Sequence, residues 1–150
     1  MTDKLEIVNV RRLAFARTDV FDAFANPDRL KIWWGPQGFT NTIPHFDFRT
    51  GGEWRIVMTA SDGTDFDNRS TFQEVVVPER IVYVHHEPMH VFTMSMVFDE
   101  RDDGTDLTWR MLFDRTEENL ALEKFLAAAN EQNFDRLEQH LNQQAGASQP

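Results

Sequence analysis

The sequence predicts an α+β fold in which one antiparallel sheet packs against a long C-terminal helix. Three observations support this prediction. Segments rich in apolar residues follow one another with only short connections, which favours antiparallel strands because parallel strands need long crossovers. Several of these segments alternate apolar and polar residues, so the sheet is expected to have one apolar face. A long final stretch carries an apolar stripe at helical spacing.

The first expected element is a strand from Leu5 to Phe15, whose side chains alternate between two sides. Its apolar residues fall on both sides, with Leu5, Ile7 and Leu13 on one and Val8 and Val10 on the other.

Two short helices are predicted next, and the second carries two adjacent tryptophans. Thr18 is expected to cap the first helix. Asn26 can accept a backbone N–H as N-cap of the second, Pro27 fits its first position, and a Gly-Pro pair ends it. Adjacent residues lie about 100° apart on a helix. Only one of Trp33 and Trp34 is therefore expected in the core, with the other at the rim.

The remaining strands are bounded by turn residues and expected at Phe39–Arg49, Glu53–Ala60, Phe66–Val77, Ile81–His86, Val91–Phe98 and Leu107–Asp114. Pro44 indicates an edge strand or a bulge, because proline donates no hydrogen bond to a strand ladder. The predicted apolar face is rich in tryptophan, methionine and phenylalanine, whose long side chains can fill irregular space or surround a guest.

The closing helix is expected from about Glu117 to Gln143, with residues 144–150 as a disordered tail, so that residues 1–143 form a single domain. Its apolar stripe, which is expected to bury against the sheet, consists of Leu122, Leu126, Ala129, Asn133 and Leu137, with Phe125 beside it. Asn133 lies in the middle of the stripe, where its amide needs a partner, a water or a ligand.

Composition excludes several classes of protein. The chain has 150 residues, 41% of them hydrophobic, and no cysteine, which excludes disulfides, thiolate zinc sites and cysteine nucleophiles. Its net charge of −10 repels nucleic-acid phosphates and acidic lipid surfaces. The first residues lack an apolar signal core, and no apolar run approaches membrane-spanning length. A soluble cytoplasmic protein with no nucleic-acid or membrane partner is therefore expected.

From about Arg11 to Leu141, the order of elements and several motifs resemble a known family. The motifs are Val20-Phe21-Asp22-Ala23-Phe24 with Asn26-Pro27, Trp33-Trp34-Gly35-Pro36, Gly38-Phe39, Arg49-Thr50-Gly51-Gly52-Glu53-Trp54, Phe72-Gln73-Glu74-Val75 and Pro78-Glu79-Arg80-Ile81-Val82-Tyr83. They are similar to those of the family related to the C-terminal domain of the activator of the heat shock protein 90 ATPase, within the START-like (SRPBCC) superfamily. The resemblance implies a helix-grip fold, in which a curved antiparallel sheet of about six or seven strands wraps around the C-terminal helix, with a cavity between them.

The superfamily includes lipid carriers, hormone receptors and polyketide cyclases that use this cavity, so the resemblance implies a pocket for an apolar or aromatic small molecule. We expect a non-enzymatic binding module without cofactor or metal, as a monomer or weak homodimer. Eukaryotic activators carry a further domain that engages the chaperone, so a co-chaperone is the less favoured alternative. The other alternative is a cyclase- or hydrolase-like enzyme in which Asn133, Tyr83 or His85 orients water or an enol.

The expected pocket is largely apolar, with a volume on the order of 300–1,000 Å³. Its expected lining is Trp34, Trp54, Met58, Met96, Trp109, Met111, Leu126 and Asn133. Packing in the core is the alternative explanation for each tryptophan.

No motif for catalysis or metal binding stands out. His85 and His86 point to opposite faces of a regular strand, which favours a solvated strand end over a metal site. The acidic stretch Asp99–Gly104 resembles a calcium loop, but Arg101 and Arg110 stand where oxygen ligands are required. No nucleophile elbow or triad spacing is present, so no catalytic residue is assigned.

Overall fold

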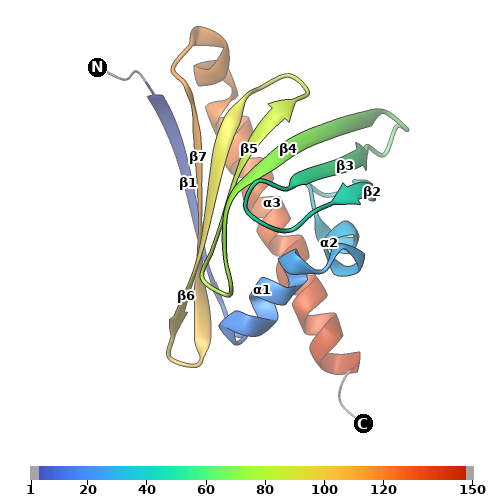
Figure 1. Ribbon diagram of the computed structural model, residues 1–150, viewed down its shortest axis with the longest axis vertical. Helices are drawn as coiled ribbons and strands as arrows, with labels where there is room; N and C mark the ends of the chain where they lie inside the picture. The colour runs from blue at the N-terminus through green and yellow to red at the C-terminus, as the bar shows by residue number, and fades with distance from the viewer. Residues whose placement is uncertain (1–3, 148–150) are drawn as a thin grey trace.

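The computed structural model describes residues 4–147, which form one curved sheet and three helices. The elements are, in order, β1 (Lys4–Leu13), α1 (Arg17–Ala25), α2 (Pro27–Trp33), β2 (Thr40–Phe46), β3 (Glu53–Thr59), β4 (Asp65–Val76), β5 (Arg80–Glu87), β6 (Phe92–Arg101), β7 (Gly104–Asp114) and α3 (Glu117–Ala147). The sheet order is β1-β7-β6-β5-β4-β3-β2, so β1 and β2 are its edges. The sheet curves around α3, and α1 and α2 lie beside the C-terminal half of that helix (Figure 1). The predicted helix-grip α+β fold is confirmed.

The inner face of the sheet is apolar and the outer face is open to solvent. In β1, Leu5, Ile7 and Leu13 are buried, whereas Val8 and Val10 are exposed, as the alternation predicts. Each neighbouring pair of strands is antiparallel. The strands begin and end within a few residues of their expected positions.

Pro44 lies where its chemistry predicts. It belongs to β2, an edge strand, and the register of β2 against β3 shifts between Thr42 and His45. Both predicted consequences of the proline, the edge position and the irregularity, are confirmed, because the missing N–H interrupts the ladder at this point.

The two short helices follow their local signals unequally. Asn26 accepts a hydrogen bond from the backbone N–H of Asp28 at 3.0 Å, and Pro27 begins α2, as predicted. The prediction that Thr18 caps α1 is wrong. Ala16 occupies the N-cap position without a side-chain cap, and its carbonyl accepts the backbone N–H of Asp19 and of Val20. The first turn is therefore closed by the backbone alone, two residues earlier than expected.

Helix α3 packs against the sheet mainly through its second half. Asn133 and Leu137 of the predicted stripe are buried, but Leu122 and Leu126 are only half-buried and Phe125 is 68% exposed. The expectation that the whole stripe buries is thus wrong for the first turns. The helix also continues to Ala147, beyond the expected end, and residues 148–150 of the expected tail lie outside the described residues.

Candidate functional site

The end of α2 directs both tryptophans of the Trp-Trp pair into the interior. Trp33 is 1% exposed and Trp34 is 8% exposed. The prediction that one lies at the rim is wrong, because Trp34 has already left the helix: its φ of −64° and ψ of 140° are extended, although its N–H still bonds to the carbonyl of Leu30. The spacing of 100° per residue holds only inside a helix. The two indoles therefore pack against each other, with ring centroids 5.6 Å apart.

Gly35 permits this turn for two reasons. Its φ is +95°, a conformation that L side chains rarely adopt. A Cβ at this position would also lie 2.7 Å from the terminal methyl of Met58. Gly35 thus lets the chain reverse directly after Trp34 while β3 approaches closely.

Arg136 of α3 holds the turn that follows α2. Its guanidinium donates hydrogen bonds of 2.8–3.1 Å to the backbone carbonyls of Ile32, Trp34, Gly35, Pro36 and Phe39. The last carbonyls of a helix lack partners within the helix, and a cationic side chain satisfies them. Burial lowers the pKa of Arg136 below its usual value, but arginine stays charged. We call residues 32–39 with their arginine donor the Trp34 turn.

The Trp34 ring lies between two other tryptophans of the sheet. Its centroid is 5.2 Å from that of Trp54 on β3 and 5.6 Å from that of Trp109 on β7. Further rings surround these two: Phe72 and Tyr83 contact Trp54, and Phe24 and Phe134 contact Trp109. Residues from both ends of the sheet and from α2 and α3 thus meet in one aromatic cluster.

Two indole N–H groups of this cluster are buried without a hydrogen-bond acceptor. Trp33 donates its indole N–H to the carbonyl of Ala23 at 3.1 Å. The indole nitrogens of Trp54 and Trp109, by contrast, are inaccessible and have no partner. Leaving a buried donor unpaired costs about 1–3 kcal/mol. Most buried polar groups are paired, so two unpaired donors in one cluster call for a physical explanation.

The space inside this cluster is small. An apolar cavity of about 10 Å³ is lined by Phe24, Leu30, Phe46, Phe48, Trp54, Phe72, Ile81 and Met96. That is about the space one water molecule needs. The expected volume of 300–1,000 Å³ is therefore wrong for this structure, because aromatic rings fill the interior. A larger hollow of about 500 Å³ lies on the solvent side of α3, but its lining is polar, for example Asp135 and Gln139, and it encloses nothing.

The predicted lining residues lie in and around the cluster. Trp34, Trp54, Met96, Trp109, Met111 and Asn133 are buried, and Met58 and Leu126 are half-buried. Trp54 and Met96 line the small cavity. Asn133 donates a long hydrogen bond of 3.4 Å to the carbonyl of Trp33, so its amide contacts the end of α2 and not a strand. The role of the eight predicted lining residues in ligand binding stays a prediction.

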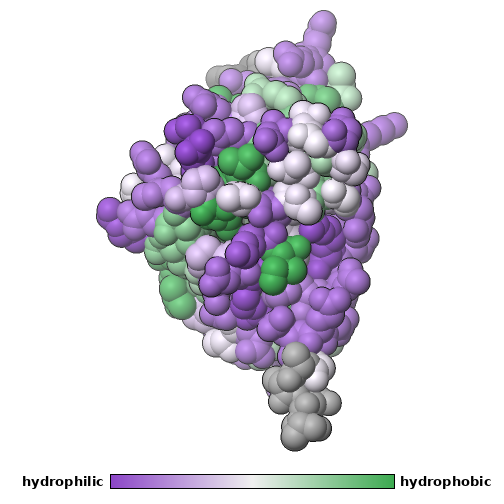
Figure 2. Space-filling model, turned by 90° about the vertical axis from the view of Figure 1, so that its right-hand side faces the viewer, coloured by the Kyte–Doolittle hydropathy of each residue, from purple (hydrophilic) through white to green (hydrophobic). Residues whose placement is uncertain are grey.

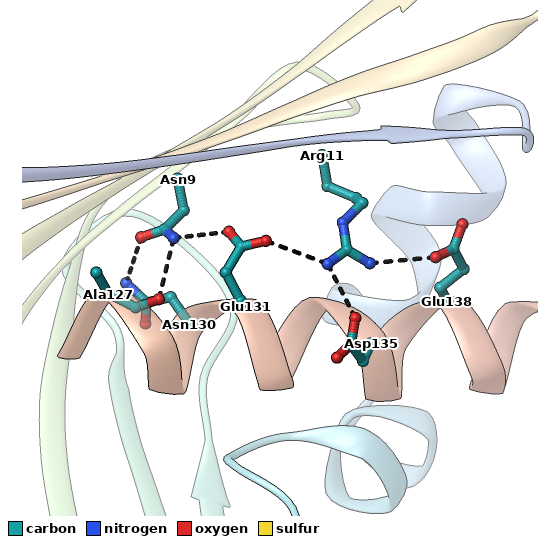
Figure 3. A network of polar contacts seen from close by, with 7 residues as sticks. All are labelled: Asn9, Arg11, Ala127, Asn130, Glu131, Asp135 and Glu138. Atoms are coloured by element: carbon teal, nitrogen blue, oxygen red, sulfur yellow. Dashed lines mark hydrogen bonds and ion pairs between the residues drawn. The ribbon is translucent and has the colours of Figure 1, made fainter. Parts of the chain in front are cut away.

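A polar network joins β1 to α3 beside the cluster (Figure 3). Asn9 donates to the carbonyl of Ala127 at 3.1 Å and to Glu131 at 2.7 Å, and Asn130 donates to Asn9 at 3.0 Å. Arg11 pairs with Glu131, Asp135 and Glu138. Burial would lower the pKa of Arg11, but hydrogen bonds to Asp135 and Glu131 raise it above its usual value.

This network and Arg136 are absent from the sequence-based predictions, although one signal was available. Alternation along β1 places Asn9 and Arg11 on the same side as Leu5, Ile7 and Leu13, so they stand on an apolar face where polar groups need partners. The network links the polar residues of β1 to the middle of α3. No comparable local signal marks Arg136, whose acceptors lie about a hundred residues earlier in the chain.

His85 is buried, so the prediction of a solvated strand end is wrong for it, while His86 is exposed on the opposite face, as predicted. One ring nitrogen of His85 lies 2.7 Å from the carbonyl of His90 and the other lies 2.8 Å from the side-chain oxygen of Asn68. Burial lowers the pKa of His85, and burial also raises the pKa of the Tyr83 hydroxyl. With both ring nitrogens of His85 engaged, the histidine is a packed structural group in this arrangement.

Among residues 4–147, no three histidine, cysteine, aspartate or glutamate side chains are grouped so as to hold a metal ion. The same residues contain no helix with the length and apolarity needed to cross a bilayer. On the face seen in Figure 2, hydrophilic residues surround small, separate hydrophobic patches. The aromatic cluster around Trp34, by contrast, contains ring faces and the unpaired indole donors of Trp54 and Trp109, which suit stacking and hydrogen bonding.

The sequence matches a known family. The profile described as "Activator of Hsp90 ATPase homolog 1-like protein" matches residues 14–142, which covers most of the chain. No curated protein matches the chain.

Solved structures from several bacteria share this architecture. A crystal structure of a protein from Nitrosomonas europaea is 24% identical, has a TM-score of 0.82, and the match covers 93% of this chain and 96% of that one. A solution structure of a protein from Arthrobacter aurescens is 19% identical with a TM-score of 0.84, covering 93% and 87%. A crystal structure of a protein from Mycobacterium smegmatis is 21% identical with a TM-score of 0.76, covering 97% and 93%. At these identities, the similarity shows a common fold.

Proposed function

The chain belongs to the family of Activator of Hsp90 ATPase homolog 1-like proteins, and we propose that it acts as a binding module for an aromatic small molecule. The family and the helix-grip fold support a ligand-binding or co-chaperone-type module. The interior aromatic cluster favours the first of these, because two of its buried indole donors have no partner among the described residues. The proposed site is the cluster of Trp34, Trp54 and Trp109.

One observation carries this proposal: the unpaired indole N–H groups of Trp54 and Trp109. A phenylalanine would supply an aromatic ring at either position without the cost of an unsatisfied donor. A ligand with hydrogen-bond acceptors would pair these groups in an environment of low dielectric, where such bonds are strong. The ligand is therefore expected to combine an aromatic surface with at least one acceptor oxygen.

The first test is native mass spectrometry of freshly purified protein, in which a retained small molecule is expected. A thermal-shift screen of aromatic ketones and of their hydrocarbon counterparts then measures affinity, because a ligand that binds the native state raises the melting temperature. After incubation, each bound molecule is recovered and its molecular mass is measured, since a cyclase- or hydrolase-like activity would change that mass. No retained molecule and no shift with any compound would remove the basis of the proposal.

Conservative variants separate the proposed donors from general packing. Trp54→Phe and Trp109→Phe are each expected to lower the affinity for an aromatic ketone about fivefold to tenfold, the equivalent of one modest hydrogen bond. The stability of the free protein should fall only by the packing that the smaller ring gives up, because the lost N–H was unpaired. Trp33→Phe is the matched control: it loses similar packing and also the hydrogen bond to Ala23, so stability falls by about 1 kcal/mol more than in the other two variants while affinity is unchanged.

A further inference from the structure

The two edges of the sheet differ in how well they are protected. An edge strand exposes backbone N–H and C=O groups that can pair with another chain, and proteins usually interrupt such strands. The edge strand β2 contains Pro44, and its register against β3 shifts between Thr42 and His45. The other edge strand, β1, has ten residues without proline, and its register against β7 is unbroken. Among residues 4–147, no second strand pairs with β1 (Figure 1), which is therefore a long open edge.

Every second residue of β1 directs its backbone N–H and C=O toward this open side. In an antiparallel pair, two opposed residues both point their backbone groups toward each other or both point them away, and the direction alternates along each strand. Phe98 of β6 donates its N–H to the carbonyl of Glu79, on the side of β5, so it points away from β7. Phe98 opposes Leu107 of β7, and Leu107 opposes Arg11 of β1. Arg11 and the other odd-numbered residues of β1 therefore bond to β7. The residues whose backbone groups face the open side are Lys4, Glu6, Val8, Val10 and Arg12.

The side chains of these same residues lie on the outer, solvent-exposed face of the sheet. In the middle of the strand, Val8 is 44% and Val10 is 57% exposed. On either side of them, the side chain of Glu6 is 48% and that of Arg12 is 45% exposed. Along the outer face the strand thus reads Glu-Val-Val-Arg. A second copy that runs antiparallel presents Arg-Val-Val-Glu, so the edge is complementary in charge to itself.

We propose that two copies of the chain pair through the open edge of β1, antiparallel and with Asn9 of one copy opposite Asn9 of the other. In this register, Glu6 of each copy faces Arg12 of the other, and Val8 faces Val10. A shift by two residues in one direction sets Lys4 opposite Arg12, where like charges destabilise the pair. A shift by one residue sets outward-facing backbone groups against groups that already bond to β7. The inference concerns a surface apart from the proposed ligand site.

The charged side chains can join this interface without leaving their present partners. Glu6 pairs with Arg110 at 3.2 Å, and Arg12 pairs with Asp106 at 3.3 Å. Across the interface these pairs line up as a row of alternating charges. The opposing effects are the net charge of −10 on each copy and the three carboxylates of α3 that surround Arg11 near this edge. Because a single pair of strands also buries little area, a dissociation constant on the order of tens of micromolar is expected.

Charge exchange tests the register, with self-association measured by analytical ultracentrifugation. Glu6→Arg sets two arginines opposite each other and Arg12→Glu sets two glutamates opposite each other, so each variant alone should self-associate about tenfold more weakly. An equimolar mixture of the two variants, and the variant that carries both changes, restore opposite charges and should regain the wild-type association. Glu53→Arg is the control: it makes the same change in net charge on an exposed residue of β3 and should not weaken association.

Backbone pairing is tested separately with Val8→Pro, which removes an N–H that faces the open side and keeps the ladder to β7. This variant is expected to be monomeric with a cooperative melting transition. If it does not fold, Val8→Lys places a charge in the middle of the edge and is held to the same criterion. Wild-type protein that stays monomeric at millimolar concentration would overturn the inference, as would a dimer that none of the β1 variants weakens. Neither outcome bears on the proposed function, which the ligand screen decides.

Discussion

Replacing Arg136 by methionine should destabilise the protein through the Trp34 turn. The guanidinium is the shared donor for the carbonyls of Ile32, Trp34, Gly35, Pro36 and Phe39, at 2.8–3.1 Å. Methionine retains much of the aliphatic side chain but donates no hydrogen bond. The change therefore removes the hydrogen bonds of the guanidinium to the end of α2 and to the turn after it, and leaves apolar packing largely in place.

The size of the loss follows from the number and setting of these bonds. One hydrogen bond from a charged donor contributes about 1.5–3 kcal/mol. The five bonds are not additive, because they share one side chain and the half-exposed carbonyls regain water. A decrease of about 3 kcal/mol in the free energy of unfolding is expected for Arg136→Met. Arg136→Lys keeps the charge but not the planar fork, so a decrease of about 1–2 kcal/mol is expected.

Urea unfolding followed by tryptophan fluorescence measures both quantities. The native emission of Arg136→Met should also shift to longer wavelength, since a looser turn exposes Trp34 to water. Arg49→Met is the control: Arg49 has a side chain 70% exposed and pairs with the nearby Asp47, so a loss below about 1 kcal/mol is expected. The reasoning is refuted if Arg136→Met is no less stable than Arg49→Met.

Three other predictions follow from single features. Burial lowers the pKa of His85 and of His140. As pH falls, the unfolded chain therefore binds protons before the folded chain does, and the urea midpoint should decrease below about pH 6.5. A midpoint that holds or rises toward pH 5.5 would contradict this. Gly52→Ala should lower the free energy of unfolding by more than about 3 kcal/mol, because the new Cβ would overlap the carbonyl oxygen of Asp47. Gly51→Ala should lower it by about 1 kcal/mol, because Gly51 has a φ of +85° but open space around it. Similar melting temperatures for the two variants would show that the loop adapts. Deleting α3 should expose the apolar face of the sheet and cause aggregation on size-exclusion chromatography, and a monomer with an unchanged melting transition would disprove the packing role of the helix.

The sequence by itself determined the features that depend on neighbouring residues. The alternation of Leu5, Ile7 and Leu13 with Val8 and Val10 settles which side of β1 is buried, since successive strand residues point to opposite faces. The short connections between strands predicted an antiparallel sheet, and the resemblance of the motifs to a known family predicted that this sheet curves around α3. Caps were predictable where a side chain does the capping, as at Asn26, and not at α1, where only the backbone closes the turn.

Only the tertiary structure decided how the interior is filled. Trp34 is buried because the chain leaves the helix at that residue and because Arg136, about a hundred residues later, holds the carbonyls of the turn. The cavity volume depends on how rings from β3, β7, α2 and α3 pack together, and no local pattern encodes the sum of their volumes. The unpaired N–H groups of Trp54 and Trp109 are likewise a property of surroundings assembled from distant segments. Periodicity and capping act over a few residues, whereas packing and hydrogen-bond pairing in a core join residues that the chain brings together only when it folds.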